Sequence, residues 1–380
     1  MNSPKVGNEN FDKLNASYKL DSVGSRNYAL DNETAPRPQY LHYAGDKKNV
    51  PELSFLNINN KRIYIYDYKS GQLKRTIDLN NLDLKGPFSI KGYFIQSLDS
   101  IYLYDEIKMR VLRINHEIKV ADSISLTNNS DLNTLAWTLK YPQYQPTTSS
   151  PFLKYEEKLL LTGMHPWALE KPFLEKLALT AKIDLNGENP KFINNYPSEH
   201  YGSEYEWDDP IFTTSYTDQS PHKDKLVISF PISHHLYISD ITTGKMKKVY
   251  AGSNYAKGIS SLRKRDKSDN KYREKLTQNV IENDLYAAVK YDKYRNIYYR
   301  FIRRSLVDIN KLPDWKNKQL GIIMMDDKFN YLGETNIGTL KDWNWENSFV
   351  SEQGLNIERI DRKTNDESLL QFQVFLPKKL

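Results

Sequence analysis

The amino-acid sequence predicts an all-β fold, and three observations support this prediction. Among the 380 residues, 27 are Tyr and 14 are Phe, and broad aromatic side chains suit the pleated surface of a sheet. Many short runs alternate apolar and polar residues with a period of two, which is typical of strands. The resulting strand-and-turn units recur at intervals of roughly 40 to 60 residues. Together these features predict a six-bladed β-propeller with four-stranded antiparallel blades.

The first two units show the pattern most clearly. Residues 63–67 (IYIYD) and 101–105 (IYLYD) each alternate and end in Asp, and a polar turn and a second alternating run follow. Residues 69–72 (KSGQ) have the composition of a hairpin turn. Continuing this assignment places five complete blades at about residues 38–79, 90–126, 147–197, 210–251 and 284–338.

The last segment, residues 347–376, contains only three predicted strands. An incomplete blade would leave the ring open and expose unpaired backbone groups at its edges. We therefore expect residues 16–23 (ASYKLDSV) to supply the missing fourth strand, so that the closing blade is split between the two ends of the chain. This divides the chain into a flexible N-terminal segment, residues 1–16, and a single propeller domain, residues 17–380.

One segment departs from the strand pattern. Residues 257–283 are predicted to contain a short helix between blades four and five, with Ser268 or Asp269 as its N-cap. The basic run at residues 263–265 (RKR) could grip a phosphate, but a solvated loop is the simpler interpretation.

Charge and composition exclude several classes of function. The net charge of +6 arises from 54 basic and 48 acidic residues spread along the chain, whereas nucleic-acid-binding proteins concentrate positive charge. The chain contains no Cys, so disulfides, thiolate catalysis and Cys-ligated zinc are excluded. There is no apolar run of the ~20 residues that a membrane span needs, and no G-x-S-x-G, Walker A or G-x-G-x-x-G motif. We predict neither a cofactor nor a metal site.

Residues 289–305 (VKYDKYRNIYYRFIRRS) combine aromatic and basic side chains and suggest a phosphate-binding surface at first sight. In the propeller they fit two antiparallel strands joined by a turn at residues 292–295. Ile297, Tyr299 and Phe301 would then share one face of the second strand, so most of the aromatic residues would pack between blades. Only Arg303 and Arg304, at the end of that strand, remain candidates for contact with a ligand.

The order of these segments resembles a known family. The quoted run around residues 53–79, the YDKYRNIYYRF run, GLNIERID at residue 354 and the C-terminal SLLQFQVFL are similar to uncharacterised six-bladed propellers of gut-type Gram-negative anaerobes. That family is catalogued as a domain of unknown function, is loosely similar to TolB-like propellers and is exported as lipoproteins. The resemblance implies an exported cell-envelope lipoprotein in the periplasm or on the outer surface. The leader and the lipid-bearing Cys of the full-length pattern are absent from this sequence, and the family offers no catalytic residues.

The strand order also predicts which residues meet at the mouth of the central channel. Connections between blades, and those between the second and third strands within a blade, emerge on one face, which we call the top face. The candidate ligand-binding residues on these connections are His165, Trp167, Tyr205, Trp207, His234, His235, Arg303, Arg304, Trp343 and Trp345.

Aromatic rings around a cavity can stack on sugar rings or cover an apolar ligand. Alternatively, long connections need small cores of their own, which Trp can provide. His234 and His235 are adjacent, and neighbours on a strand point to opposite faces, so a shared metal site is disfavoured.

Two functions remain open. The first is a non-catalytic binding or scaffold module, a monomer that presents its top face to a protein or glycan at the cell envelope. The second is a hydrolase or lyase with its site at the channel mouth. No catalytic residue can be assigned from the sequence, and no nucleic-acid partner is expected.

Overall fold

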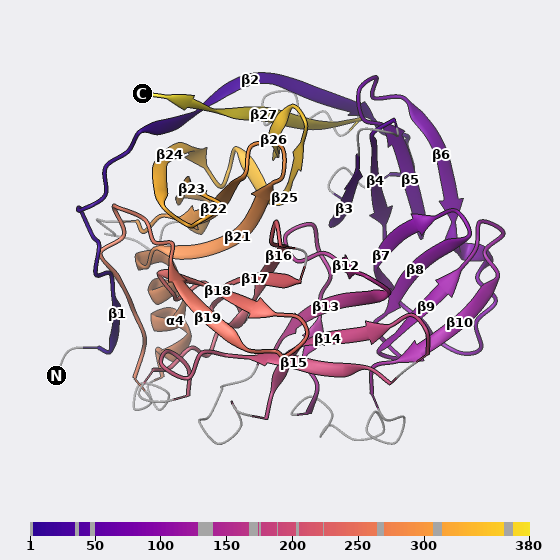
Figure 1. Cartoon of the computed structure of the whole chain (residues 1–380), viewed down its shortest axis with the longest axis horizontal. Coiled ribbons are helices and arrows are strands. Elements are labelled where there is room, and N and C mark those ends of the chain that lie inside the picture. The colour runs from indigo at the N-terminus through magenta and orange to yellow at the C-terminus, as the bar shows by residue number, and fades with distance from the viewer. Residues whose placement is uncertain are drawn as a thin grey trace.

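The computed structural model describes residues 3–34, 38–45, 50–127, 140–166, 174, 176–187, 189–202, 205–222, 224–263, 270–306, 314–360 and 368–380. The strands form six blades around a central axis (Figure 1). Each blade is an antiparallel sheet of four strands, and in blade three the inner strand is divided into β11 and β12. The predicted six-bladed propeller is therefore confirmed. Within the described ranges, no helix is long and apolar enough to cross a membrane.

The blades follow each other along the chain. Blade one consists of β3 (Tyr40–Ala44), β4 (Glu52–Asn57), β5 (Arg62–Asp67) and β6 (Leu73–Asp78). Blade two consists of β7 (Ile90–Ser97), β8 (Ser100–Asp105), β9 (Arg110–Ile114) and β10 (Val120–Ser125). Blade three consists of β11 (Gln143–Tyr144), β12 (Leu153–Tyr155), β13 (Lys158–Met164), β14 (Ala178–Asp184) and β15 (Lys191–Asn195). Blade four consists of β16 (Tyr216–Gln219), β17 (Lys225–Ser229), β18 (His235–Asp240) and β19 (Met246–Tyr250). Blade five consists of β21 (Leu285–Asp292), β22 (Ile297–Arg303), β23 (Gln319–Asp326) and β24 (Tyr331–Thr339). In each of these blades the first strand lies nearest the axis, and the inner strands β16, β21, β25, β3 and β7 contact one another in turn.

The closing blade is split, as predicted. Its inner three strands are β25 (Trp343–Ser351), β26 (Gly354–Arg359) and β27 (Leu369–Lys379), and its outer strand is β2 (Tyr18–Ala29) from the other end of the chain. The β2–β27 pairing runs from Tyr18 opposite Lys379 to Ala29 opposite Leu369, with one irregularity (Figure 1). This pairing is the only backbone ladder that joins the first and last parts of the ring within the described residues.

The segment before β2 also makes contacts. Strand β1 (Lys5–Gly7) pairs with β20 (Gly258–Ser260), which follows blade four. Asn8 donates hydrogen bonds from Nδ2 to the carbonyls of Ser253 and Ala256, at 2.8 and 2.7 Å. The division of the chain at residue 16 stays a prediction.

An Asp ends the third strand in four of the first five blades: Asp67, Asp184, Asp240 and Asp326. In blade two Asp105 ends the second strand, β8, instead. In blade four the carboxylate of Asp240 accepts hydrogen bonds from the backbone N–H and the hydroxyl of Thr243, at 2.7 and 2.9 Å. Gly244 then adopts a φ of 72°, which a glycine tolerates without steric cost. The repeated Asp therefore fixes the turn by satisfying backbone groups that leave the ladder.

The helix between blades four and five is α4 (Tyr272–Glu282). Lys271 occupies its N-cap position and makes no capping hydrogen bond through its side chain. The predicted caps were wrong in position, since Ser268 and Asp269 precede the helix and lie outside the described residues. The helix is held instead by long-range contacts: Asn279 and Asn283 donate to the carbonyl of Ser260, at 2.8 and 2.9 Å. Short helical turns occur at η1 (Leu79–Asn81), α3 (Pro210–Thr213) and η4 (Trp315–Asn317).

The aromatic and basic segment at residues 289–305 forms part of a wall between blades, as the sequence indicated. Ile297, Tyr299 and Phe301 lie in one hydrophobic cluster of blades five and six. Arg300 is 0% exposed on the opposite side of β22, with its Cζ 3.9 Å from the centre of the Tyr286 ring. Its guanidinium donates to the hydroxyl of Ser229 and to three backbone carbonyls of blade four. A buried charge is tolerated when its donors are satisfied in this way.

A loop of blade three fills the central channel. The inner strand of this blade is interrupted between β11 and β12, and residues 145–152 leave the sheet, with Thr147 and Ser150 paired by two backbone hydrogen bonds of 3.3 and 3.1 Å. The Thr148 hydroxyl accepts from the Leu41 N–H of blade one at 2.8 Å and donates to Asn347 of blade six at 3.0 Å. The buried Lys290 of blade five donates to the Thr148 carbonyl. We call residues 145–152 the channel plug.

The plug reaches the remaining two blades as well. The hydroxyl groups of Ser150 and Thr217, in blade four, are 3.3 Å apart. On the side of blade two, a Cβ atom at Gly92 would overlap the ring of Pro146 in the plug. The plug therefore contacts the inner strands of all five other blades, which places it on the axis of the ring.

Replacing Gly92 with Ala tests this packing. The added methyl group would collide with the rigid Pro146 ring, so we expect the free energy of unfolding to fall by about 1 to 3 kcal/mol. Urea denaturation followed by circular dichroism would measure the change. Gly24→Ala is the matched control, because a Cβ atom there meets nothing within 4 Å. Equal stabilities of the two variants would contradict the described contact.

Candidate functional site

A large cavity opens on the top face above the channel plug. Its volume is about 1060 Å³, which is just above the range of about 300 to 1,000 Å³ that is typical of small-molecule sites. Residues of the plug form part of its wall, together with the inner strands β11, β16 and β25 and the C-terminal turn of α4. Because the plug closes the channel beneath it, this cavity is the space that remains at the channel mouth.

The cavity lining combines aromatic and uncharged polar side chains. Three Trp residues contribute to it: Trp315, Trp343 and Trp345. Hydroxyl and amide groups face the same space, among them Gln39, Gln143, Gln145, Thr147, Ser149 and Ser150. Aromatic faces combined with hydrogen-bond donors and acceptors suit a ligand that has apolar ring faces and many hydroxyl groups.

One wall of the cavity is formed by Tyr216, Trp345 and Arg303. The rings of Tyr216 and Trp345 meet edge to face, with their centroids 5.5 Å apart. The Cζ atom of Arg303 lies 5.4 Å from the centre of the Trp345 ring. Arg303 is only 4% exposed, and its Nε and Nη2 atoms have no hydrogen-bond partner among the described residues. The structure thus brings a desolvated cation against two aromatic rings.

A carboxyl group lies in the same cavity. Glu346 follows Trp345 on β25, and its exposed side chain lines the cavity. Desolvation by the surrounding protein raises the pKa of Glu346, and the positive charge of Arg303 acts in the opposite direction. Asp209 and Lys316 also line the cavity, which therefore holds two acidic and two basic side chains.

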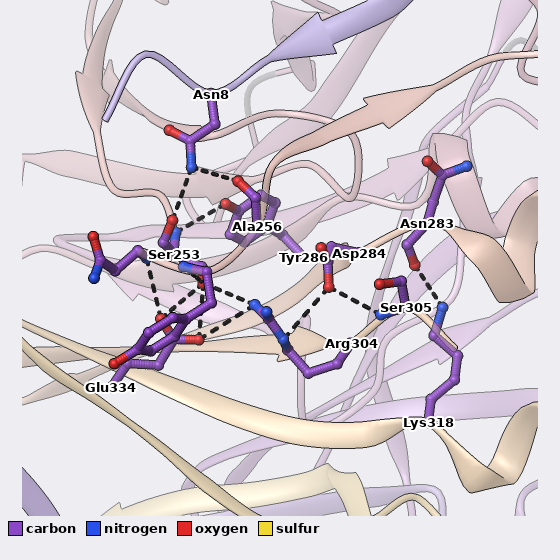
Figure 2. Close-up of polar contacts among 12 residues, drawn as sticks. Asn8, Ser253, Ala256, Asn283, Asp284, Tyr286, Arg304, Ser305, Lys318 and Glu334 are labelled. Carbon is purple, nitrogen blue, oxygen red and sulfur yellow. Dashed lines mark hydrogen bonds and ion pairs between the residues drawn. The ribbon is translucent and has the colours of Figure 1, made fainter. Parts of the chain in front are cut away.

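Arg304 is placed differently from Arg303, although they are neighbours. Figure 2 shows its guanidinium between Asp284 and Glu334, at distances of 3.5 and 3.6 Å. It also donates to the hydroxyl of Ser253 at 2.8 Å. Its charge is therefore used to connect blade five with the segment after blade four, and it is not part of the cavity lining.

His234 and His235 lie between blade four and the N-terminal segment. His234 is 1% exposed; its Nδ1 accepts from the Tyr286 hydroxyl at 2.7 Å, and its Nε2 lies 3.4 Å from the Val6 carbonyl. His235 has its Nε2 3.5 Å from Glu9 and an edge-to-face contact with Tyr250. Neither residue lines the cavity.

Three further candidates belong to the connection between blades three and four or to its surroundings. Trp207 stacks on Tyr205 with a centroid distance of 5.7 Å and donates from Nε1 to the His200 carbonyl at 2.8 Å. His165 is buried, and its backbone N–H donates to the Tyr196 hydroxyl at 2.9 Å. These three residues pack away from the cavity, and Trp167 lies outside the described residues.

The cavity thus contains Arg303, Trp343 and Trp345 from the predicted set. Sequence reasoning missed Glu346, Tyr216 and the hydroxyl groups of the plug. A signal for the plug existed, since PTTSSP at residues 146–151 is a run of small polar residues between two Pro in a predicted inner strand. Among the described residues, no group of three His, Asp or Glu side chains is arranged to hold a metal ion.

The fold and this site define a six-bladed propeller with a plugged channel and a binding-sized cavity at its mouth. A family model described as a domain of unknown function, DUF4221, matches residues 17–336. The chain belongs to the DUF4221 family, which agrees with the resemblance found in the sequence.

Two solved structures extend the comparison. A DUF4221 member from Bacteroides vulgatus is 20% identical, with a TM-score of 0.76 over 96% of this chain and 99% of that chain. A protein from Bacteroides fragilis, named as a candidate exported protein, is 13% identical, with a TM-score of 0.55 over 95% and 96% of the two chains. At these identities they show the shared fold. A search of the curated proteins found no match.

His234 gives a prediction about acid stability. Burial is the main cause that lowers the pKa of this imidazole to about 3, and the positive charge of Arg300 makes a smaller contribution to the same value, whereas an unfolded His titrates near ~6.5. Between these values the unfolded chain binds more protons, so the stability that is present above pH 6.5 is lost as the pH falls. The expected loss between pH 6.5 and pH 5 is about 2 kcal/mol from this residue.

Urea denaturation of the wild type and of His234→Gln across pH 5 to 8 would measure this contribution. The Gln side chain can still accept a hydrogen bond from Tyr286, and it does not titrate. We expect the stability curves to run parallel above pH 7 and to converge at acid pH. Identical slopes below pH 6.5 would show that His234 does not contribute.

Proposed function

We propose that this protein is a non-catalytic binding module whose ligand is a glycan held in the top-face cavity. The observation that carries the proposal is the lining of this cavity, where Trp343 and Trp345 lie among hydroxyl and amide side chains. Sugars present apolar ring faces and many hydroxyl groups, and both find partners in such a lining.

The channel plug supports a binding role over transport through the ring. Its hydrogen bonds to Leu41, Asn347 and Lys290 close the axis below the cavity. A ligand that enters from the top face therefore meets a floor of small polar residues. This floor is largely preformed, which reduces the entropy lost on binding.

A location at the cell envelope is part of this proposal. The family resemblance implies export with a lipid anchor, and the Bacteroides fragilis structure carries the name of a candidate exported protein. A glycan-binding propeller on the envelope of a gut anaerobe would meet extracellular polysaccharides directly.

A second candidate function rests on Glu346. Desolvation raises the pKa of this carboxyl group, and a carboxyl group with a raised pKa in a cleft is a candidate general acid. The protein would then be a hydrolase or lyase that acts on the same class of ligand. Glu346→Gln should remove such turnover, measured as released reducing ends, without removing binding.

The binding function is tested by calorimetric titration of the protein with glucose, glucuronic acid, glucose 6-sulfate and their short oligosaccharides. We expect at least one of these to bind, and Trp345→Ala to weaken that binding by at least about tenfold, since loss of a central aromatic contact costs 1.4 kcal/mol or more. Tyr255→Ala is the control, because Tyr255 is an exposed aromatic residue that does not line the cavity. The proposal fails if no saccharide binds, or if the two variants behave alike.

A further inference from the structure

The run that contains Arg300, Arg303 and Arg304 places three cations in one blade, and their surroundings differ. Arg300 donates to a hydroxyl group and three carbonyls. Arg304 lies between two carboxylates. Arg303 is 4% exposed, but its Nε and Nη2 have no partner within the described part of the chain. Of the three, Arg303 is the one whose hydrogen-bonding capacity is unused.

The identity of the two unpartnered atoms matters. Nε and Nη2 lie on the same edge of the planar guanidinium group, and this edge donates two parallel hydrogen bonds to a carboxylate or a similar anion with two oxygens. A buried charge without hydrogen bonds is costly to the folded protein. Both atoms are covered by the wall of the cavity that Arg303 lines, and an anion that displaces this cover and binds along the edge would remove the cost.

The electrostatic surroundings of Arg303 favour the same ligand. Lys318 is buried nearby and donates to the carbonyls of Val280, Ile281 and Asn283 at the end of α4, at 2.7, 3.1 and 2.6 Å. Figure 2 shows its contact with Asn283. Its charge interacts repulsively with that of Arg303. Lys316 also lines the cavity. Glu346 is the opposing charge, and it makes no hydrogen bond to Nε or Nη2 of Arg303.

We infer that the cavity recognises an acidic saccharide, with Arg303 binding a carboxylate or sulfate group of the sugar while the ring lies against Trp345 and Tyr216. This inference rests on the proposed function and specifies its ligand. The contact between Arg303 and Trp345 places the anionic group and the ring face side by side, as they are in a uronic acid or a sugar sulfate. The polar lining provided by the plug then meets the remaining hydroxyl groups.

The test compares glucuronic acid, glucose 6-sulfate and glucose by calorimetric titration of the wild type, Arg303→Met and Arg303→Lys. We expect the wild type to bind one of the acidic sugars about tenfold to a hundredfold more tightly than glucose, the range of a charge-assisted paired hydrogen bond. Arg303→Met should bind all three sugars alike. Arg303→Lys should keep only part of the preference for the acidic sugar, since Lys has the positive charge but not the two parallel N–H donors of the guanidinium group. Whichever of glucuronic acid and glucose 6-sulfate binds more tightly shows whether Arg303 recognises a carboxylate or a sulfate group.

Two controls separate ligand recognition from a structural role. Arg75→Met removes a partly exposed arginine of the outer strand β6 and should leave the preference unchanged. Arg303→Met should melt at the wild-type temperature or above it in the absence of sugar, because an unpartnered buried charge is replaced by an apolar side chain of similar length. A much lower melting temperature would make Arg303 a structural residue and overturn the inference.

The remaining outcomes are also decisive. Equal binding of glucose and both acidic sugars by the wild type would overturn the acidic specificity and leave the glycan-binding function intact. Absence of binding to every sugar would overturn both. Triglutamate binding as tightly as the preferred sugar, and depending on Arg303, would assign the site to an acidic peptide and contradict the saccharide.

Discussion

The hydrogen bonds of Thr148 hold the centre of this molecule together. A ring of six blades leaves a channel along its axis, and an unfilled channel would leave the inner strands without packing partners on that side. Here a single residue of blade three bonds to inner strands of blades one, five and six. The buried Nζ of Lys290 donates to the Thr148 carbonyl of the plug. The six sheets are therefore fixed to one another at the axis as well as through the hydrophobic clusters between them.

The position of the channel plug also determines the shape of the candidate site. Because the plug lies next to Gly92 and Asn347, it forms a floor below the channel mouth, so that a cavity open on the top face takes the place of an open pore. Trp343 and Trp345 lie at the start of β25, the inner strand of the closing blade, and both line the cavity, with Trp345 only 6% exposed. The chemistry of the cavity thus follows from an interruption in one inner strand.

The fold could be predicted because its determinants are local. Alternating runs such as IYIYD, and the Asp that ends the third strand in four blades, are readable within a few residues, and they give the blades nearly at their observed bounds. Helix α4 shows the limit of such reasoning: Ser268 looked like a cap, whereas the helix is positioned by Asn279 and Asn283 through contacts with Ser260. The plug was missed for the same reason, since its partners come from five other blades.

The candidate site was predictable only in part. Arg303, Trp343 and Trp345 reach the cavity because strand order alone places the ends of β22 and β25 on the top face. Arg304 occupies the same face by sequence, but Glu334 and Asp284 engage its charge (Figure 2). The partners that engage Arg304 and leave the donors of Arg303 unused are 20 or more positions away in the sequence. A local sequence pattern therefore cannot distinguish these two adjacent arginines.

The split closing blade has a consequence for synthesis of the chain. Strand β2 leaves the ribosome long before its partner β27, with Tyr18 opposite Lys379. Until β27 is made, β2 is an unpaired strand beside a growing series of blades, and such strands recruit foreign chains. The ring can close only after every strand of the sixth blade has been synthesised.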